Sequence, residues 1–598
     1  MEQQPAISDY GFLSDSRSGA LVGKDGSIDW WCPHRFDGAS VFGRLLDPRA
    51  GHFRLAPVGV GGPGCRVERA YRPDTLVLRT VHHTPHGSVA VTDALAAQVG
   101  ARAHELGMNS PAVLIRVVEG LSGRVRMALD FAPRPEYGLL TPYLHEQPDG
   151  GVLAGAGPVV LVLHADGLRL RAGIDRVTHE FEVSAGQVVG MDVAFGAAYG
   201  DPPARLDPVA TLAETVRAWE AYRESHRYSG RYPDLVRQSA TVLTGLTYAR
   251  SGAVAAALTT SLPERIGGDR NYDYRYSWLR DFSLTMRALW VAACPDEASR
   301  LFAWATRSIG RIGDDPVPVL FGLEGERDIS EHHCRLRGYR DSRPVRIGND
   351  AWLQRQLDVP GEVISAVWQL RDYLGATFEG ELQEMVLGLT EQVVATWQLP
   401  DRGMWETRGE ERHYLSSKVI CWQTLDLAVG LADRLGERAE PRRWAGVRDE
   451  IRDAVLREGW NDRIGAFTGA FGSAELDASA LILPVAHFLP ATDPRMRSTM
   501  AMVERELGTD DGLLRRWSTD PAGFLMCSFW LVECLVMAGE SQRAEALFER
   551  VAGYANDVGL FSEQIDLRTG DQLGNTPQAL SHVGLINAAW RLTEPDSY

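Results

Sequence analysis

Long apolar runs, closely spaced cysteines and an excess of basic residues are all missing from this 598-residue sequence. No apolar stretch approaches the roughly 20 residues that a membrane-spanning helix needs. The first residues, MEQQPAISDYGF, contain no basic segment followed by an apolar one, so we expect no signal peptide. The net charge of −17, from 62 basic and 79 acidic residues, argues against a nucleic-acid partner. We also expect no membrane partner.

The seven cysteines are scattered as single residues, and no two of them have CxxC spacing. A sparse, odd-numbered set of this kind is typical of reduced thiols, so we predict a cytoplasmic protein. The sequence also lacks a P-loop, a GxGxxG at a strand–helix junction and a GxSxG, which are signatures of nucleotide-binding and serine-hydrolase sites. Homo-oligomerisation stays open.

Amphipathic helical stretches follow one another from about residue 233 to the C-terminus. Their connections alternate between a few residues and roughly 15 to 50 residues, and ordered loops that long are usually functional. The predicted helices pair as 233–249 with 281–294, 296–310 with 360–375, 380–398 with 415–435, 440–458 with 476–489, 493–507 with 523–539, and 541–555 with 577–592. Short joints include Cys294–Pro295, Gly375–Gly380 and Gly539–Ser541.

Six helical hairpins with all long loops at one end indicate an (α/α)6 barrel. The alternative, an α-solenoid, should show self-similarity at a fixed period, and we find none. Residues 1–205 differ, because short β-branched segments alternate with Gly, Pro and Asp, which predicts an antiparallel β-sandwich. We therefore predict a β-sandwich domain at 1–205, a helical linker at 206–230 and a catalytic barrel at 231–598. The sandwich could bind carbohydrate or serve only for packing.

The first long loop contains GGDRNYDYRYSWLRD, in which four aromatic residues are interleaved with arginines and aspartates. A polyol is recognised by flat apolar faces combined with directional hydrogen bonds, so this segment suits a sugar. The alternative is a loop held together by ion pairs around buried aromatics.

Two further loops each carry a candidate catalytic carboxyl group. Glu406 directly follows Trp405, and we expect the indole to desolvate that carboxyl group and favour its protonated form, as a general acid requires. Glu563 lies between Ser562 and Gln564, polar neighbours that favour an ionised general base. Either residue alone could be a solvated surface side chain. As a pair, they match the acid and base of glycoside hydrolysis, with 6.5–9.5 Å between the carboxyl groups if the enzyme inverts.

The second long loop, about 311–359, contains several acidic residues beside His332 and His333. Adjacent histidines point in different directions in a helix or a strand, so they do not match zinc spacing. We predict no metal site there. A sugar-binding or structural role, with Arg343 and Arg346 as donors, is favoured.

The quoted segments together resemble glycoside hydrolase family 15, whose bacterial members include glucoamylases, glucodextranases and trehalases. The similarity extends over nearly the whole chain. It rests on DYGFLSDSRSGALVGKDGSIDWWCPHRFDGASVF near the start, then TTSLPERIGGDRNYDYRYSWLRD, SRPVRIGN, QRQLDVPGEV, MWETRGEERH and FSEQIDLRTGDQLGNTPQALSHVGLINAA. The family fold is a β-sandwich joined by a linker to an (α/α)6 barrel, in agreement with the helix pattern.

The resemblance also implies a role for each site residue. Glu406 matches the general acid and Glu563 the general base, while Arg280 and Asp281 match the pair that binds the hydroxyls of the non-reducing glucose. The remaining matches are Trp278 and Trp405 in the pocket wall, Tyr274 beside the base, and Arg516 in the substrate site. The implied reaction is single-displacement hydrolysis of an α-glucosidic bond with release of β-glucose. It needs no cofactor, although some bacterial trehalases of the family depend on phosphate and magnesium.

Two departures from the family pattern concern the leaving-group side. The loop before Phe524 is shortened to STDPAGF, so we expect one wall of the pocket mouth to be missing. Fungal glucoamylases have a second acid after the general acid, and Thr407 stands at that place here. We predict an inverting α-glucosidase whose first-choice substrate is trehalose. The alternatives are a glucoamylase-like or isomaltose-type exo-α-glucosidase acting on short oligosaccharides, and a non-hydrolytic sugar-binding or biosynthetic protein.

Overall fold

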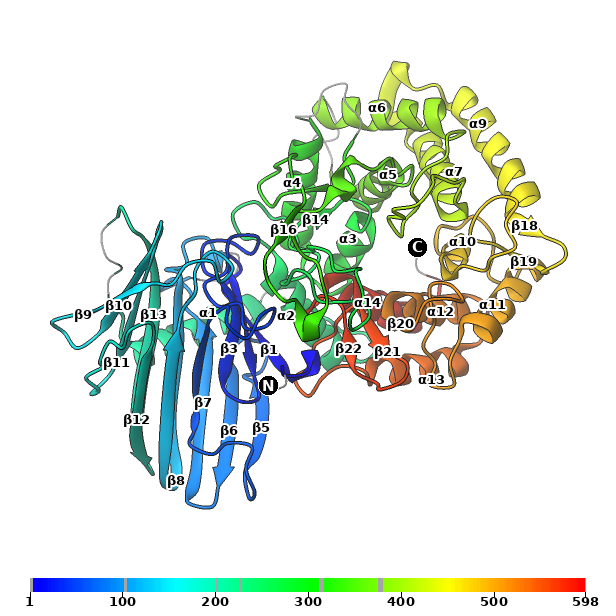
Figure 1. The fold of residues 1–598 in the computed structure, drawn as a ribbon. Coiled ribbons are helices and arrows are strands. Elements are labelled where there is room, and N and C mark those ends of the chain that lie inside the picture. Colours follow the sequence, from blue (N-terminus) through cyan, green and yellow to red (C-terminus); the bar gives the residue numbers. More distant parts are fainter. Residues whose placement is uncertain are drawn as a thin grey trace.

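The computed structural model describes residues 4–101, 105–200, 203, 205–224, 227–310, 317–374 and 380–596. Figure 1 shows two parts, an N-terminal β-domain and a C-terminal ring of helices. The predicted helix joint at Gly375–Gly380 falls almost entirely outside the described residues.

The β-domain is an antiparallel network organised around one long strand, β8 (Val113–Ala132). The first half of β8 pairs with β7 (Gly87–Leu95) and β13 (Val188–Ala197). The second half pairs with β4 (His52–Pro57) and β12 (Val177–Ser184). The other strands are β1 (Tyr10–Ser14), β2 (Gly19–Gly23), β3 (Ser27–Cys32), β5 (Arg66–Tyr71), β6 (Leu78–Thr84), β9 (Tyr143–Glu146), β10 (Val152–Ala156) and β11 (Val159–Ala165).

The predicted antiparallel domain is confirmed, with one difference in its strands. The segments 112–119 and 124–131 indicated two strands, but they form the single strand β8. No turn separates them because residues 120–123 stay paired with the start of β7. Buried and exposed residues alternate along β12, so its apolar side chains face the core.

Six inner helices form a closed ring in the C-terminal part (Figure 1), since each contacts the next and the last contacts the first. These are α3 (Phe282–Val291), α5 (Val359–Leu370), α7 (Leu415–Gly430), α10 (Ile482–Val485), α12 (Leu525–Met537) and α14 (Ala579–Thr593). Their outer partners are α2 (Pro233–Leu246), α4 (Pro295–Gly310), α6 (Glu381–Thr396), α9 (Pro441–Ala454), α11 (Pro494–Leu507) and α13 (Ser541–Ala552). Helix α1 (Pro208–Glu224) precedes the ring.

The inner and outer helices differ in composition as their positions require. Twelve of the thirteen residues of α12 are buried, whereas α9 buries only Trp444, Ile451 and Ala454. A helix that is apolar all round belongs in an interior, and an amphipathic one covers it. The helix predicted at 476–489 is shorter than expected, being a 3₁₀ turn followed by α10. Pro484 has no backbone N–H, so a continuous α-helix beginning at residue 478 would lack the hydrogen bond from residue 484 to the carbonyl of residue 480.

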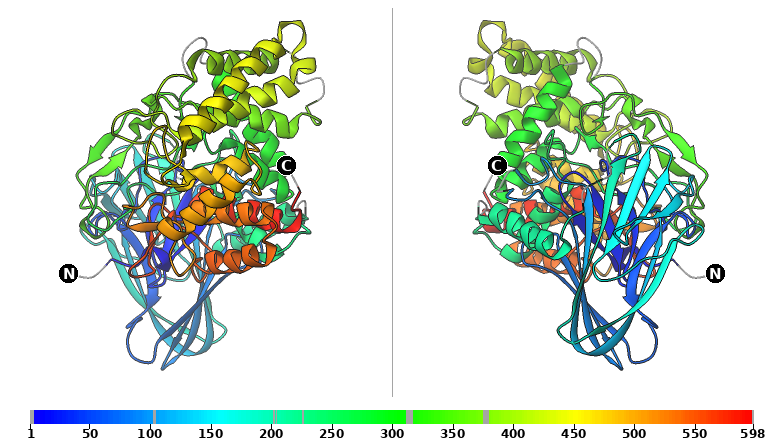
Figure 2. Two further views of the ribbon diagram at one scale, coloured as in Figure 1. Left: turned by 90° about the vertical axis from the view of Figure 1, so that its right-hand side faces the viewer. Right: turned by 90° about the vertical axis from the view of Figure 1, so that its left-hand side faces the viewer.

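Partly buried ion pairs and hydrogen bonds join the β-domain to the loop end of the ring. Arg275 donates from Nη1 to the Gly38 carbonyl at 2.9 Å, and Arg69 donates from Nε to Asp557 at 3.0 Å. In the side views of Figure 2, the far ends of the blue strands project beyond the ring. None of the described helices has the length and apolar character needed to cross a membrane.

Candidate active site

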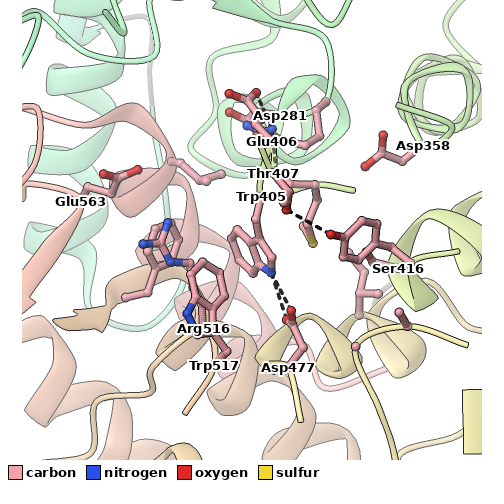
Figure 3. A pocket seen from close by; sticks show the side chains of 18 of the residues that line it. Asp281, Asp358, Trp405, Glu406, Thr407, Ser416, Asp477, Arg516, Trp517 and Glu563 are labelled. Atoms are coloured by element: carbon pink, nitrogen blue, oxygen red, sulfur yellow. Dashed lines mark hydrogen bonds and ion pairs between the residues drawn. The ribbon is translucent and has the colours of Figure 1, made fainter. Parts of the chain in front are cut away.

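A cavity of about 480 Å³ opens where the long connections meet, and all eight predicted site residues line it. Figure 3 shows Glu563 on one side of this space and Asp358 on the other, with Glu406 beside Asp281. The predicted residues are Tyr274, Trp278, Arg280, Asp281, Trp405, Glu406, Arg516 and Glu563. Four segments far apart in the sequence thus converge on one pocket.

The first long loop is held in place by a buried ion pair between alternate residues. Asp273 accepts from both Nε (2.8 Å) and Nη2 (2.7 Å) of Arg275, and both side chains are fully buried. The guanidinium of Arg275 also lies over the rings of Trp30 and Tyr137 in the β-domain. The side chain between these two residues, Tyr274, is thereby fixed toward the pocket.

Glu563 is a buried carboxyl group in a polar surround. It directly precedes the short strand β21 (Gln564–Asp566) and is only 4% exposed. Its Oε1 accepts hydrogen bonds from the hydroxyl of Tyr274 at 2.9 Å and from Nε2 of Gln578 at 3.3 Å. Burial, and then the negative charge of Glu264, raise the pKa of Glu563 to about 8, although Arg516 and Tyr274 act in the opposite direction. The expectation that polar neighbours would favour the ionised form was therefore wrong, because burial dominates.

Glu406 has a different environment from the one that the sequence suggested. We expected desolvation by Trp405, but Oε1 of Glu406 accepts from Trp278 Nε1 at 2.5 Å and from Arg280 Nη1 at 2.8 Å. The loop turns at this residue, whose φ of 55° lies in the left-handed region. Because of that turn, the carboxyl group faces the first long loop and a cation, so the expectation about its surroundings was wrong.

Trp405 is held by a carboxyl group that the sequence analysis missed. Its Nε1 donates to both oxygens of Asp477, at 3.0 and 3.1 Å. Asp477 also accepts from the backbone of Ser479 and begins the 3₁₀ turn before α10, so it fixes the ring relative to an inner helix. The sequence does contain a signal for Asp477, because an aspartate directly before an apolar run is typical of a helix N-cap.

Arg516 lies at the pocket wall between two carboxylates. It donates from Nη2 to Glu264 at 2.5 Å and from Nε to Asp520 at 2.7 Å. The guanidinium also stacks on Trp517 (4.7 Å) and Phe524 (4.9 Å). Glu264, which the sequence analysis did not single out, is therefore part of this pocket.

The expected glucose-binding pair is joined by a direct ion pair within the cavity. Arg280 Nε donates to Asp281 at 3.1 Å, and its Nη1 also reaches the Met404 carbonyl at 2.7 Å. Two further buried carboxyl groups at the start of α5, Asp358 and Glu362, line the same part of the pocket. Burial raises the pKa of Asp358 to about 7 and that of Glu362 to about 8, so both favour the protonated form.

The second long loop supports the rim of the pocket, because its Glu331 and Arg346 contact Arg408 and Tyr272, which line the cavity. Glu331 accepts hydrogen bonds at 2.8 Å from both Arg346 and Arg408, and their guanidinium groups lie at 4.9 and 5.0 Å from the ring of Tyr272. His332 lies in an exposed short strand. Within the described part of the chain, no three His, Cys, Asp or Glu side chains are grouped to hold a metal ion.

Comparison with known proteins assigns this arrangement to a family. The profile of "Glycosyl hydrolases family 15" matches residues 230–590, and that of "Trehalase-like, N-terminal" matches residues 1–208. The chain belongs to glycosyl hydrolase family 15. It is therefore a glycoside hydrolase, and the first profile contains all eight of its predicted site residues.

Similar members of the family carry the name trehalase. The chain is 36% identical to the trehalase of Mycobacterium tuberculosis, over 98% of this chain and 89% of that protein. It is 32% identical to the trehalase of Thermoplasma volcanium, over 99% and 94% of the two chains. A bacterial glucoamylase complexed with acarbose shares the fold, with a TM-score of 0.75 at 14% identity over 99% of this family 15 chain and 96% of the other.

Proposed function

We propose that this family 15 enzyme hydrolyses α,α-trehalose to two glucose molecules with inversion at the attacked carbon. The observation that carries this proposal is the single pocket in which Glu406 and Glu563 accompany the Arg280–Asp281 pair. Binding alone needs no pair of carboxyl groups, so the pair favours hydrolysis over a purely sugar-binding role. All eight candidate residues lie within residues 231–598, which we propose as the catalytic domain.

In the proposed reaction, Glu406 transfers its proton to the glycosidic oxygen as the bond from that oxygen to C1 breaks. A water molecule attacks C1 from the opposite face, and Glu563 accepts the proton that the water loses. One glucose leaves with its original α configuration and the attacked glucose is released as the β anomer. Glu563 must be ionised to accept a proton. Burial and the charge of Glu264 outweigh Arg516 and Tyr274 and raise its pKa to about 8, so the base becomes available as the pH rises through that value.

The other pocket residues position the glucose that is attacked. Arg280 and Asp281 provide donors and acceptors for its hydroxyls, and the faces of Trp278 and Trp405 suit its C–H surfaces. Because Trp405 is tied to Asp477 and Trp278 to Glu406, these rings are already oriented before substrate binds.

Trehalose is the preferred substrate because relatives that match the chain over nearly its whole length are named trehalases. We also propose that the enzyme acts in the cytoplasm on this small disaccharide. All seven cysteines lie within the described residues and are free thiols, in keeping with a reducing compartment. The proposed chemistry uses only side chains of this chain.

The test is release of glucose from trehalose, maltose, isomaltose and kojibiose by the purified enzyme, with and without phosphate and magnesium. We expect trehalose to be hydrolysed fastest. A preference for maltose or isomaltose would show that the enzyme is an exo-α-glucosidase and not a trehalase. If the folded enzyme releases glucose from none of the disaccharides, the proposed hydrolysis is wrong. Activity only when both ions are present would show that the enzyme requires them.

A further inference from the structure

A second hollow, of about 280 Å³, adjoins the main pocket. The two share four lining residues, namely Glu264, Arg270, Trp517 and Thr519. The second hollow is built from the segments 264–270 and 517–521 only. A molecule that extends beyond the main pocket on this side therefore meets these two segments.

The wall common to both hollows contains an aromatic ring in a fixed position. Trp517 pairs through its backbone with Asp477, the residue that also holds Trp405. The Arg270 guanidinium lies 5.4 Å from the Trp517 ring, and its side chain is 52% exposed. Its N–H groups are thus accessible from the solvent side for hydrogen bonding to a ligand.

Glu264 provides a carboxylate on the same wall. It is 8% exposed, and both nearby cations approach one of its oxygens, Oε2: Arg516 at 2.5 Å and Arg270 at 3.8 Å. An ionised carboxylate has about four acceptor positions on its two oxygens, so Oε1 can accept a hydroxyl group. Aromatic surface, guanidinium donors and a carboxylate acceptor are the groups that recognise a pyranose.

The shortened loop before Phe524 still lines this wall, through Trp517, Thr519, Asp520 and Pro521. Asp520 bonds to Arg516 by its side chain and to the Trp517 carbonyl by its N–H at 3.0 Å, which folds the segment into a compact turn. On the side of Glu406, the following residue is Thr407, whose hydroxyl accepts from Tyr414 at 3.1 Å. Thr407 carries no carboxylate, whereas Glu264 of the first long loop places one on the wall shared by the two hollows.

We propose that Glu264, Arg270 and Trp517 form the binding site for the leaving hexopyranose, that is, the second glucose of the disaccharide. This inference rests on the proposed function, since it assigns the half of trehalose that the Arg280–Asp281 pair does not hold. In this arrangement Arg270 and Glu264 bind hydroxyls of the leaving ring, and Trp517 lies against its C–H face.

The experiment compares two substrates that carry the same attacked glucose. Trehalose has a leaving sugar, whereas α-glucosyl fluoride releases only fluoride. We expect Arg270→Ala to lower kcat/KM for trehalose by about tenfold or more, the loss of one charged hydrogen bond, and to leave kcat/KM for α-glucosyl fluoride unchanged. Arg335→Ala, at another exposed arginine, is the matched control and should change neither value.

A second measurement separates binding from turnover. Trehalose should bind about tenfold more weakly to the inactive double variant Glu563→Gln/Arg270→Ala than to Glu563→Gln, as measured by calorimetric titration. Equal losses on both substrates, or none on trehalose, would overturn the leaving-sugar site while trehalose hydrolysis stood. If the wild type hydrolyses α-glucosyl fluoride but neither cleaves nor binds trehalose, the proposed substrate is wrong, and with it this assignment.

Discussion

Arg280 donates a hydrogen bond from Nη1 to Oε1 of Glu406 at 2.8 Å, and its Nε bonds to Asp281 at 3.1 Å. One guanidinium thus joins the carboxyl group expected to protonate the leaving oxygen to the carboxylate expected to bind glucose. Glucose hydroxyls that bind to Arg280 would compete with Glu406 for its donors. We therefore expect glucose binding at Arg280 to weaken its ion pair with Glu406.

Replacing each candidate catalytic carboxyl group should give a different pattern with two substrates. Glu406→Gln should lower kcat for trehalose by roughly 10²–10⁴, but much less for α-glucosyl fluoride, because fluoride leaves without a proton. Glu563→Gln should lower kcat for both substrates, since both need an activated water. Steady-state kinetics checks this, with the exposed Glu410→Gln as control. The opposite pattern would exchange the two roles.

The backbone at Glu406 should be strained, because its φ of 55° is unfavourable for a residue with a side chain. Both Glu406→Gly and Glu406→Ala remove the contacts with Trp278 and Arg280, so their difference reports the backbone alone. We expect the free energy of unfolding of Glu406→Gly to exceed that of Glu406→Ala by about 1 kcal/mol. Urea denaturation measures this difference. Equal stability of the two variants would show that the strain relieved by glycine is no larger than the extra entropy that glycine gives the unfolded chain.

The pH dependence of kcat/KM should reveal the raised pKa of Glu563, to about 8. A base works when deprotonated, so kcat/KM should rise with pH through this pKa in the free enzyme. The charge of Glu264 contributes to the raised value, next to burial, and Glu264→Gln should move the rising limb to lower pH. A rising limb that stays at the same pH, or moves to higher pH, would contradict the assigned electrostatic coupling between Glu264 and Glu563.

Glu362 should make the fold less stable as the pH rises. Its folded pKa of about 8 lies above the usual range of a glutamate, so its contribution is fully present below the unfolded pKa and is lost as pH rises through the folded value. Glu362→Gln removes the titration, and we expect its melting temperature to fall less than that of the wild type between pH 5 and 9. The control is Glu381→Gln, at an exposed position. If the melting temperatures of Glu362→Gln, Glu381→Gln and the wild type fall in parallel with pH, this prediction is contradicted.

Sequence patterns alone predicted the helical ring and pointed to Glu406 and Glu563, whereas the family resemblance assigned the other six residues that line the pocket. Helix periodicity and alternating connection lengths are local signals, and they place all long loops at one end. The unbroken strand β8 was missed because it depends on pairing with β7, which no local pattern shows. The shortness of α10 was missed although Pro484 is a visible signal in the sequence.

The electrostatics of the pocket could not be predicted from neighbouring residues in the sequence. Glu406 follows Trp405, yet it pairs with Arg280, 126 positions away. Glu264 reaches Arg516 across 252 positions and thereby affects Glu563. Such pairings are set by how loops from different hairpins meet in space, and no local pattern carries that information.

The anomeric form of the glucose released from trehalose tests the proposed mechanism most directly. Proton NMR during the first minutes, at an enzyme concentration that makes hydrolysis faster than mutarotation, measures the two anomers separately. Inversion by Glu406 and Glu563 predicts equal initial amounts of α- and β-glucose, since one ring is attacked and the other leaves unchanged. Formation of α-glucose alone would show retention and would contradict the account.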